Sequence, residues 1–170
     1  NDTALYSMSM SKLIVSTREN KGLNYQIGLH SNHQSAKGKR ILQKEQFQND
    51  YAIFSNIEFA TNNLLFRPGI RFIYNDQFTA PIIPSINILY SLDRIKYRVS
   101  YARGFRAPTI KELFFEFNDI NHDIVGNPLL LSEISNNYQA NLSYKTDLKL
   151  LQFTFDLSCF HNKIINKIDL

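Results

Sequence analysis

Tryptophan is absent from this chain of 170 residues, and cysteine occurs only once, at Cys159. A single cysteine excludes a disulfide within the chain. Glycine is also scarce, and no apolar run approaches the roughly 18 residues that a transmembrane helix requires. These absences leave a membrane β-barrel open, because each strand of such a barrel is marked only by alternating apolar and polar residues.

Sequence motifs of common enzymes are missing as well. The chain has no Gly-x-Ser-x-Gly, His-Glu-x-x-His or Cys-x-x-Cys sequence, and no glycine-rich phosphate loop. The net charge is only +4, and the basic residues form no stripe along the sequence. We therefore expect no catalytic residues, no resident cofactor or metal, and no nucleic-acid partner.

Aromatic residues are abundant, with 13 phenylalanines and 9 tyrosines. Apolar residues recur at every second position in eight segments, and this period is typical of β-strands. In the clearest segment, Phe66 and Phe72 point one way while Arg67 and Arg71 point the other. The predicted strands are 4–16, 23–33, 49–60, 64–74, 82–91, 95–104, 136–145 and 148–160.

The connections between these strands alternate in length. The short ones are predicted at 17–22, 61–63, 92–94 and 145–148, and the longer ones at 34–48, 75–81 and 105–135. Outer-membrane barrels have short periplasmic turns and longer extracellular loops, and an antiparallel meander then gives this alternation. We predict an all-β, antiparallel up-and-down meander that forms part of a large transmembrane β-barrel. A soluble antiparallel domain with one apolar face is the alternative.

The two faces of the predicted sheet differ in chemistry. The apolar face carries tyrosines near the strand ends, as the aromatic girdles of membrane barrels require. The predicted lipid-facing set includes Phe66, Ile70, Phe72, Tyr97, Val99, Phe153 and Phe155. The predicted lumen-facing basic set is Arg67, Arg71, Lys96 and Arg98. These cations would either contact an anionic solute or pair with carboxylates, such as Glu58 and Asp156 or those of a plug inside the barrel.

The connection at 105–135 is long enough to carry a function. Its apolar cluster (Leu113, Phe114, Phe115 and Phe117) favours a loop that folds on itself over the barrel mouth. Ile124, Val125 and Leu129–Leu131 are predicted to supply the opposing surface. Glu112 and Glu133 flank the cluster and could each meet Arg106 or Arg103. The candidate ligand-binding residues are Arg106, Glu112, His122, Asn127 and Glu133.

The same stretch resembles a known family. The sequences GFRAP at 104–108 and GNPLLLSE at 126–133 are similar to two boxes of TonB-dependent outer-membrane receptors, RGFRAP and NPxLxPE. Ser132 stands where that family usually has proline. Asp50–Phe54 and Pro68–Arg71 also resemble the family in the same order, so the likeness extends over roughly Asn24 to Leu170.

The resemblance implies a barrel portion covering residues 1–170, truncated at both ends and lacking the family's plug domain. It implies a location in the outer membrane of a Gram-negative bacterium, in contact with lipid. Such receptors take up a scarce anionic or iron-containing solute, such as a ferric siderophore, when TonB pulls on the plug through the N-terminal region. Two alternatives remain: a haem receptor, in which His122 would bind the iron of the transported haem, and a non-transporting structural or adhesion protein. Otherwise His122 is a polar loop residue.

Overall fold

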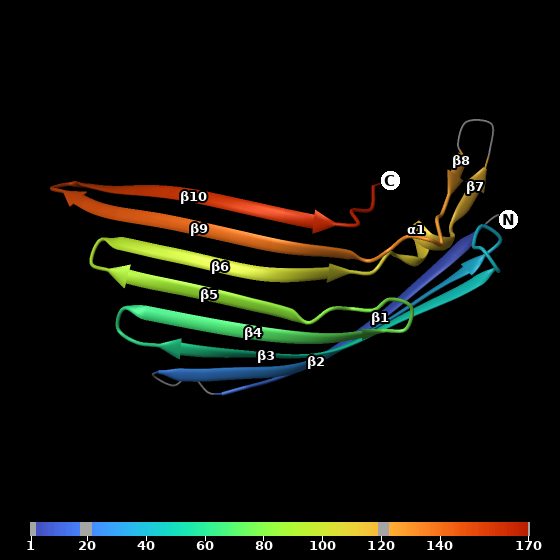
Figure 1. Cartoon of the computed structure of the whole chain (residues 1–170), viewed down its shortest axis with the longest axis horizontal. Helices are drawn as coiled ribbons and strands as arrows, with labels where there is room; N and C mark the ends of the chain where they lie inside the picture. The colour runs from blue at the N-terminus through green and yellow to red at the C-terminus, as the bar shows by residue number, and fades with distance from the viewer. Residues whose placement is uncertain (1–2, 18–21, 119–122, 170) are drawn as a thin grey trace.

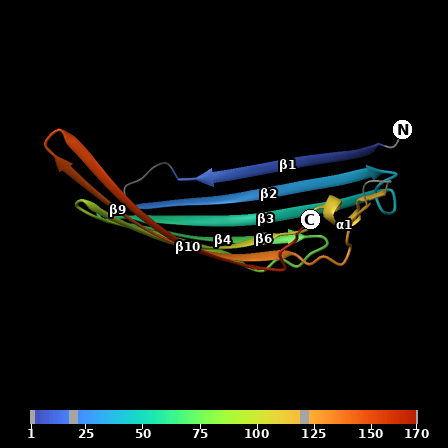
Figure 2. The ribbon, with the colours of Figure 1, turned by 90° about the horizontal axis from the view of Figure 1, so that it is seen from above.

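The computed structural model describes residues 3–17, 22–118 and 123–169. In this part of the chain, eight strands form one antiparallel sheet in the order β1-β2-β3-β4-β5-β6-β9-β10 (Figure 1). The strands are β1 (Ala4–Ser16), β2 (Leu23–Gly38), β3 (Glu45–Ala60), β4 (Leu64–Asn75), β5 (Ile83–Leu92), β6 (Ile95–Arg106), β9 (Glu133–Leu148) and β10 (Leu151–Ile165). The sheet is curved and open, with β1 and β10 at its edges (Figure 2). The predicted up-and-down meander is confirmed.

The connections lie at opposite ends of the sheet, as the sequence predicted (Figure 1). Short turns occupy one end, which we call the turn end, although 18–21 lie outside the described residues. The other end, the loop end, holds the connections at 39–44, 76–82 and 107–132, of which the first is as short as the connection at 17–22. We call residues 107–132 the mouth loop. It contains α1 (Ile110–Phe114) and a small hairpin of β7 (Glu116–Asn118) and β8 (Asp123–Val125).

Three predicted connections are wrong in extent. Residues 34–48 are mostly strand, because polar residues beyond the apolar band still complete the backbone ladder, as in the Gln34–Gln48 pair. The turn predicted at 145–148 lies instead after Leu148, where Lys149 adopts a φ of 53°. The long connection shrinks to 107–132 at both ends, since the Arg106–Glu133 pair is still part of the ladder.

Cross-strand pairing defines two faces of the sheet. Phe66 pairs with Phe59, Tyr97 with Tyr90, and Phe155 with Tyr144, so the apolar residues of successive strands share one surface, which we call the outer face. All seven predicted lipid-facing residues lie on it, and the four predicted lumen-facing cations lie on the opposite, inner face. The predicted separation of these residues onto two opposite faces is therefore confirmed.

Aromatic rings line the outer face in the half of the sheet nearer the loop end. The rings of Tyr51 and Tyr74 lie 6.4 Å apart between centroids, and those of Tyr101 and Tyr138 lie 5.0 Å apart. Most large apolar side chains of this face remain exposed, because no second layer covers it in the described structure. A continuous apolar surface of this kind is typical of a membrane or a protein interface. No helix of the described residues is long and apolar enough to cross a membrane.

Strand β1 departs from the common pattern. Its apolar residues Tyr6 and Met8 pair with Ala36 and Gln34 of β2, which places them on the inner face. The serines between them therefore point outward. This half of β1 pairs with the part of β2 that continues toward the loop end, past the level of Tyr51, so an apolar outer face is not required there.

The buried core is small and lies at the loop end. Ala36 on the inner face of β2 packs with Ile41 and Ile110, and Phe114 and Phe115 extend this cluster. The mouth loop therefore packs against the inner face of the sheet. The predicted opposing surface is wrong: Ile124, Val125, Leu129 and Leu131 are all exposed. The long β2–β3 hairpin supplies Ala36 and Ile41 in their place.

Candidate functional site

The mouth loop begins with a short capped helix. The Thr109 hydroxyl accepts a hydrogen bond from the Glu112 backbone N–H at 3.2 Å, and the Thr109 backbone N–H donates to Glu112 Oε2 at 2.7 Å. This reciprocal pair is a capping box and fixes the start of α1. The predicted loop contained no helix, although Thr-x-x-Glu at 109–112 is the sequence signal of such a box.

The first part of the mouth loop is joined to the β2–β3 hairpin. The buried Gln48 side chain donates from Nε2 to the Pro108 carbonyl at 3.1 Å. Backbone hydrogen bonds of 2.9 Å run from Leu42 N–H to the Phe114 carbonyl and from Glu116 N–H to the Arg40 carbonyl. Two connections that are distant in the sequence are thus held together over the inner face. No sequence pattern indicates a role for Gln48, because its role depends on this packing.

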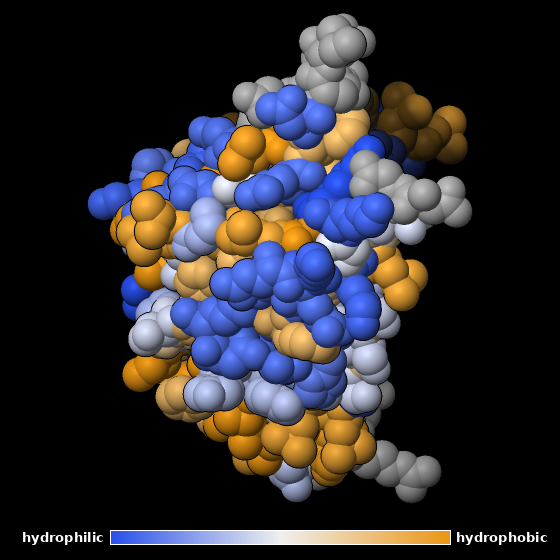
Figure 3. All heavy atoms as spheres, turned by 90° about the vertical axis from the view of Figure 1, so that its right-hand side faces the viewer, coloured by the Kyte–Doolittle hydropathy of each residue, from blue (hydrophilic) through white to orange (hydrophobic). Residues whose placement is uncertain are grey.

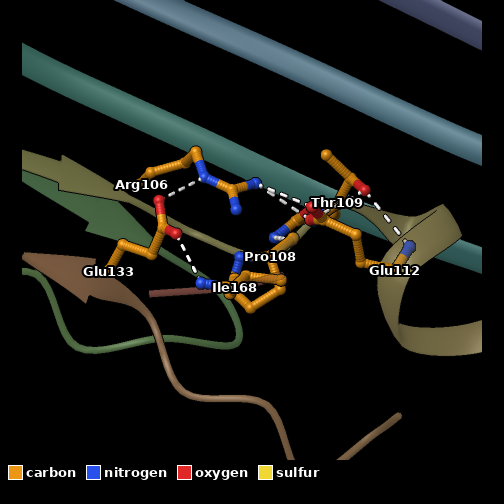
Figure 4. A network of polar contacts seen from close by, with 7 residues as sticks. Arg106, Pro108, Thr109, Glu112, Glu133 and Ile168 are labelled. Atoms are coloured by element: carbon orange, nitrogen blue, oxygen red, sulfur yellow. Dashed lines mark hydrogen bonds and ion pairs between the residues drawn. The ribbon is translucent and has the colours of Figure 1, made fainter. Parts of the chain in front are cut away.

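Arg106 links the two ends of the mouth loop (Figure 4). Its Nε donates to Glu133 Oε2 at 2.7 Å, and its Nη1 donates to Glu112 Oε2 at 2.9 Å. The other Glu133 oxygen accepts from the Ile168 backbone N–H at 2.6 Å, which ties in the segment after β10. We call Arg106, Glu112 and Glu133 the clamp. The predicted pairing of both glutamates is confirmed with Arg106 rather than Arg103, since Arg103 lies on the outer face.

The environment of Glu112 stabilises its charged form. Burial alone would raise the pKa of this carboxyl, but hydrogen bonds from the Thr109 backbone, the Arg106 guanidinium and the Thr109 hydroxyl lower the pKa below its usual value. A depressed pKa contributes stability above the usual titration range of a glutamate, and this stability is lost as the pH falls through the folded-state pKa. The clamp is therefore expected to weaken only in acid.

The far end of the mouth loop is held by backbone contacts. The Asn127 N–H donates to the Glu112 carbonyl at 2.9 Å, and the Asn127 side-chain oxygen accepts from the Leu129 N–H at 2.9 Å. Gly126 passes so close to α1 that an added Cβ would lie 2.7 Å from the Leu113 carbonyl carbon. His122, the remaining candidate ligand residue, lies outside the described residues.

A polar cavity of about 280 Å³ lies under the start of the mouth loop. Arg71 Nη2 lies 2.8 Å from His30 Nδ1, and because arginine can only donate, His30 accepts through this nitrogen. Asp50 accepts from the Asn75 amide at 2.7 Å. We call this space the mouth cavity. Its lining includes His30, Gln34, Gln48, Asp50, Arg71, Arg106 and Thr109. In Figure 3, hydrophilic residues gather over the middle of the loop end.

The predicted lumen-facing cations are separated by the structure. Arg71 lies in the mouth cavity, whereas Arg67 is bound to Glu58 nearer the turn end, with a 2.9 Å hydrogen bond from its Nε. Lys96 and Arg98 line another inner-face hollow of about 410 Å³, which also includes Asp156. The described residues contain no group of three or more histidine, cysteine or acidic side chains that could hold a metal ion.

The chain matches the family described as "TonB dependent receptor-like, beta-barrel" over residues 15–170. A match over most of the chain, together with the meander and its two faces, shows that the protein belongs to this family. Its members are receptors rather than enzymes. No curated protein has a matching sequence.

Solved structures share the fold at low sequence identity. The siderophore receptor PirA from Pseudomonas aeruginosa is 18% identical with a TM-score of 0.74, covering 92% of this chain and 30% of PirA. A mutant of the ferric enterobactin receptor PfeA from the same organism is 16% identical with a TM-score of 0.78, covering 95% and 27%. The FrpB iron transporter from Neisseria meningitidis is 11% identical with a TM-score of 0.68, covering 95% and 28%. The chain thus spans less than a third of the length of these relatives.

Proposed function

We propose that this chain is part of the barrel wall of a TonB-dependent receptor in the outer membrane of a Gram-negative bacterium. The outer face supports this location, because its apolar residues and aromatic rings have the arrangement of a lipid-facing surface. The inner face carries polar and charged side chains, as a water-filled or plugged lumen requires. A plug domain and a TonB-binding segment would belong to the rest of the complete protein.

The solute that we propose is a ferric siderophore, captured at the loop end and admitted past the mouth loop. The observation that carries this proposal is the inward packing of the mouth loop over the mouth cavity, where the clamp holds both loop ends. A loop in this position can contact a solute before it enters the lumen. Two of the structural relatives are named as siderophore receptors or ferric enterobactin receptors, which favours this class of solute.

Deletion of residues 113–126 from the complete protein tests this function. The deletion removes α1 from Leu113 onward and the β7–β8 hairpin but leaves all eight strands of the main sheet intact. In a host that lacks its own ferric-siderophore receptors, we expect the complete protein to restore iron uptake only when TonB is present. The deletion should insert into the membrane normally and fail to restore uptake.

The outcomes separate the alternatives. Normal uptake by the deletion variant would mean that the mouth loop is not the capture element. Uptake that persists without TonB would contradict the mechanism. A complete protein that inserts but transports no ferric siderophore or haem would favour the structural or adhesion alternative.

A further inference from the structure

The outer face contains few charged side chains. Among the strand residues that the structure describes, the register places four of them there: Lys37, Glu45, Arg103 and Lys163. Lys37 and Glu45 face each other across the end of the β2–β3 hairpin, with Nζ and Oε1 3.5 Å apart. Arg103 and Lys163 are therefore the two outward cations that do not face an outward carboxylate on a neighbouring strand.

These two cations lie on either side of the same residue, Asn136, of the strand between them. Arg103 on β6 pairs with Asn136 on β9, and Asn136 pairs with Lys163 on β10. Their Cα atoms are thus two strand spacings apart, roughly 10 Å, which two long side chains can bridge. We call Arg103, Asn136 and Lys163 the cationic row. The Nε of Arg103 is shielded from solvent and has no hydrogen-bond partner among the described residues.

An aromatic row lies directly beneath the cationic row. It consists of Tyr101, Tyr138 and His161, each of which lies two positions nearer the turn end than the member of the cationic row on its strand. The ring centroids of Tyr101 and Tyr138 are 5.0 Å apart, and those of Tyr138 and His161 are 6.2 Å apart. The Tyr101 hydroxyl donates to the Asn136 side-chain oxygen at 2.8 Å and so joins the two rows. Aromatic residues of this kind mark the level where the hydrocarbon of a bilayer meets its headgroups.

We propose that the cationic row binds the phosphate of a lipid headgroup in the leaflet that faces the loop end. This inference rests on the membrane location proposed above. The apolar outer face continues up to the aromatic row, so a lipid whose chains lie against that face brings its phosphate to Arg103 and Lys163. Guanidinium and ammonium groups are the side chains that bind phosphate best. The nearby carboxylate of Glu133 does not compete, since it lies on the inner face and is bound to Arg106.

The test measures lipid retained by the complete protein. The purified protein in neutral detergent is titrated with phosphatidylglycerol or with uncharged diacylglycerol, and bound lipid is counted by native mass spectrometry. We expect selective retention of phosphatidylglycerol. Arg103→Gln or Lys163→Gln should weaken it about fivefold each, and the double variant about thirtyfold. Arg103→Lys, which keeps the charge, should restore most of the retention.

Lys37→Gln is the matched control, because it removes an outward lysine that already faces Glu45. It should retain phosphatidylglycerol as the native sequence does. Equal retention by the double variant and the native sequence would overturn the inference, and so would displacement of the lipid by an equal concentration of inorganic phosphate. Failure of the native protein to insert into vesicles would instead refute the membrane location on which the inference rests.

Discussion

Removing the charge of Arg106 should release the mouth loop without disturbing the sheet. Arg106→Gln leaves the carboxylates of Glu112 and Glu133 without their guanidinium partner. Those carboxylates are 12% and 18% exposed, whereas the Arg106 side chain is 41% exposed. Shielded hydrogen bonds to charged groups contribute about 1.5–3 kcal/mol each, and exposed ion pairs about 0.2–1 kcal/mol. Because Arg106 is partly in water, we expect a loss of about 1–2 kcal/mol in the free energy that keeps the loop closed.

Amide hydrogen exchange of the complete protein measures this loss directly. The amides of Leu113, Phe115 and Asn127 are hydrogen-bonded within the loop, and they exchange when the loop opens. A loss of about 1–2 kcal/mol should speed their exchange about fivefold to thirtyfold. Strand amides of β6 and β9 below the clamp should keep their native rates.

Arg67→Gln is the control, since it removes a similar arginine–carboxylate pair, with Glu58, toward the turn end. It should leave the loop amides unchanged. Native exchange at Leu113 and Phe115 in Arg106→Gln would refute the reasoning. The loop would then be held by the small core and by its hydrogen bonds to the β2–β3 hairpin alone.

Four further predictions concern the mouth loop, the two faces of the sheet and His122. Gly126→Ala should displace the loop and speed exchange at Leu113, because the new Cβ would lie 2.7 Å from the Leu113 carbonyl carbon; an unchanged rate would contradict this close packing. Lowering the pH below about 4, the usual range of a glutamate, should lower the protection factors of the loop amides more in the native protein than in Glu112→Gln, in which Glu133 is the clamp carboxylate that still titrates. In vesicles, with the native Cys159 replaced by alanine, Phe72→Cys should react with a lipid-confined label and Arg71→Cys should not; the opposite result would mean that the two faces are assigned the wrong way round. If His122 binds haem iron, His122→Ala should abolish haem uptake and leave siderophore uptake intact. No change in either uptake would show that His122 is not a ligand.

The alternation of residues was sufficient to predict the sheet and its two faces. Side chains of a strand alternate by geometry, so the apolar positions in segments such as 64–74 define the outer face before any pairing is known. The order of the strands followed from the connection lengths, since short turns join antiparallel neighbours. The clamp was predictable in part, because Glu112 and Glu133 flank the only large apolar cluster of the long connection.

The position of the mouth loop was decided only by the tertiary structure. Its apolar residues could be buried against any surface of suitable shape. The sequence pattern predicted that this surface lies within the loop itself, and that prediction was wrong. The β2–β3 hairpin continues past the apolar band because backbone pairing does not require apolar side chains, and it brings Ala36, Ile41 and Gln48 to the loop. Burial against Ala36 and Ile41, and the hydrogen bond from Gln48 to Pro108, turn the loop toward the inner face. Contacts between such distant residues depend on how far the paired strands extend beyond the apolar band, which the alternation of apolar residues does not encode.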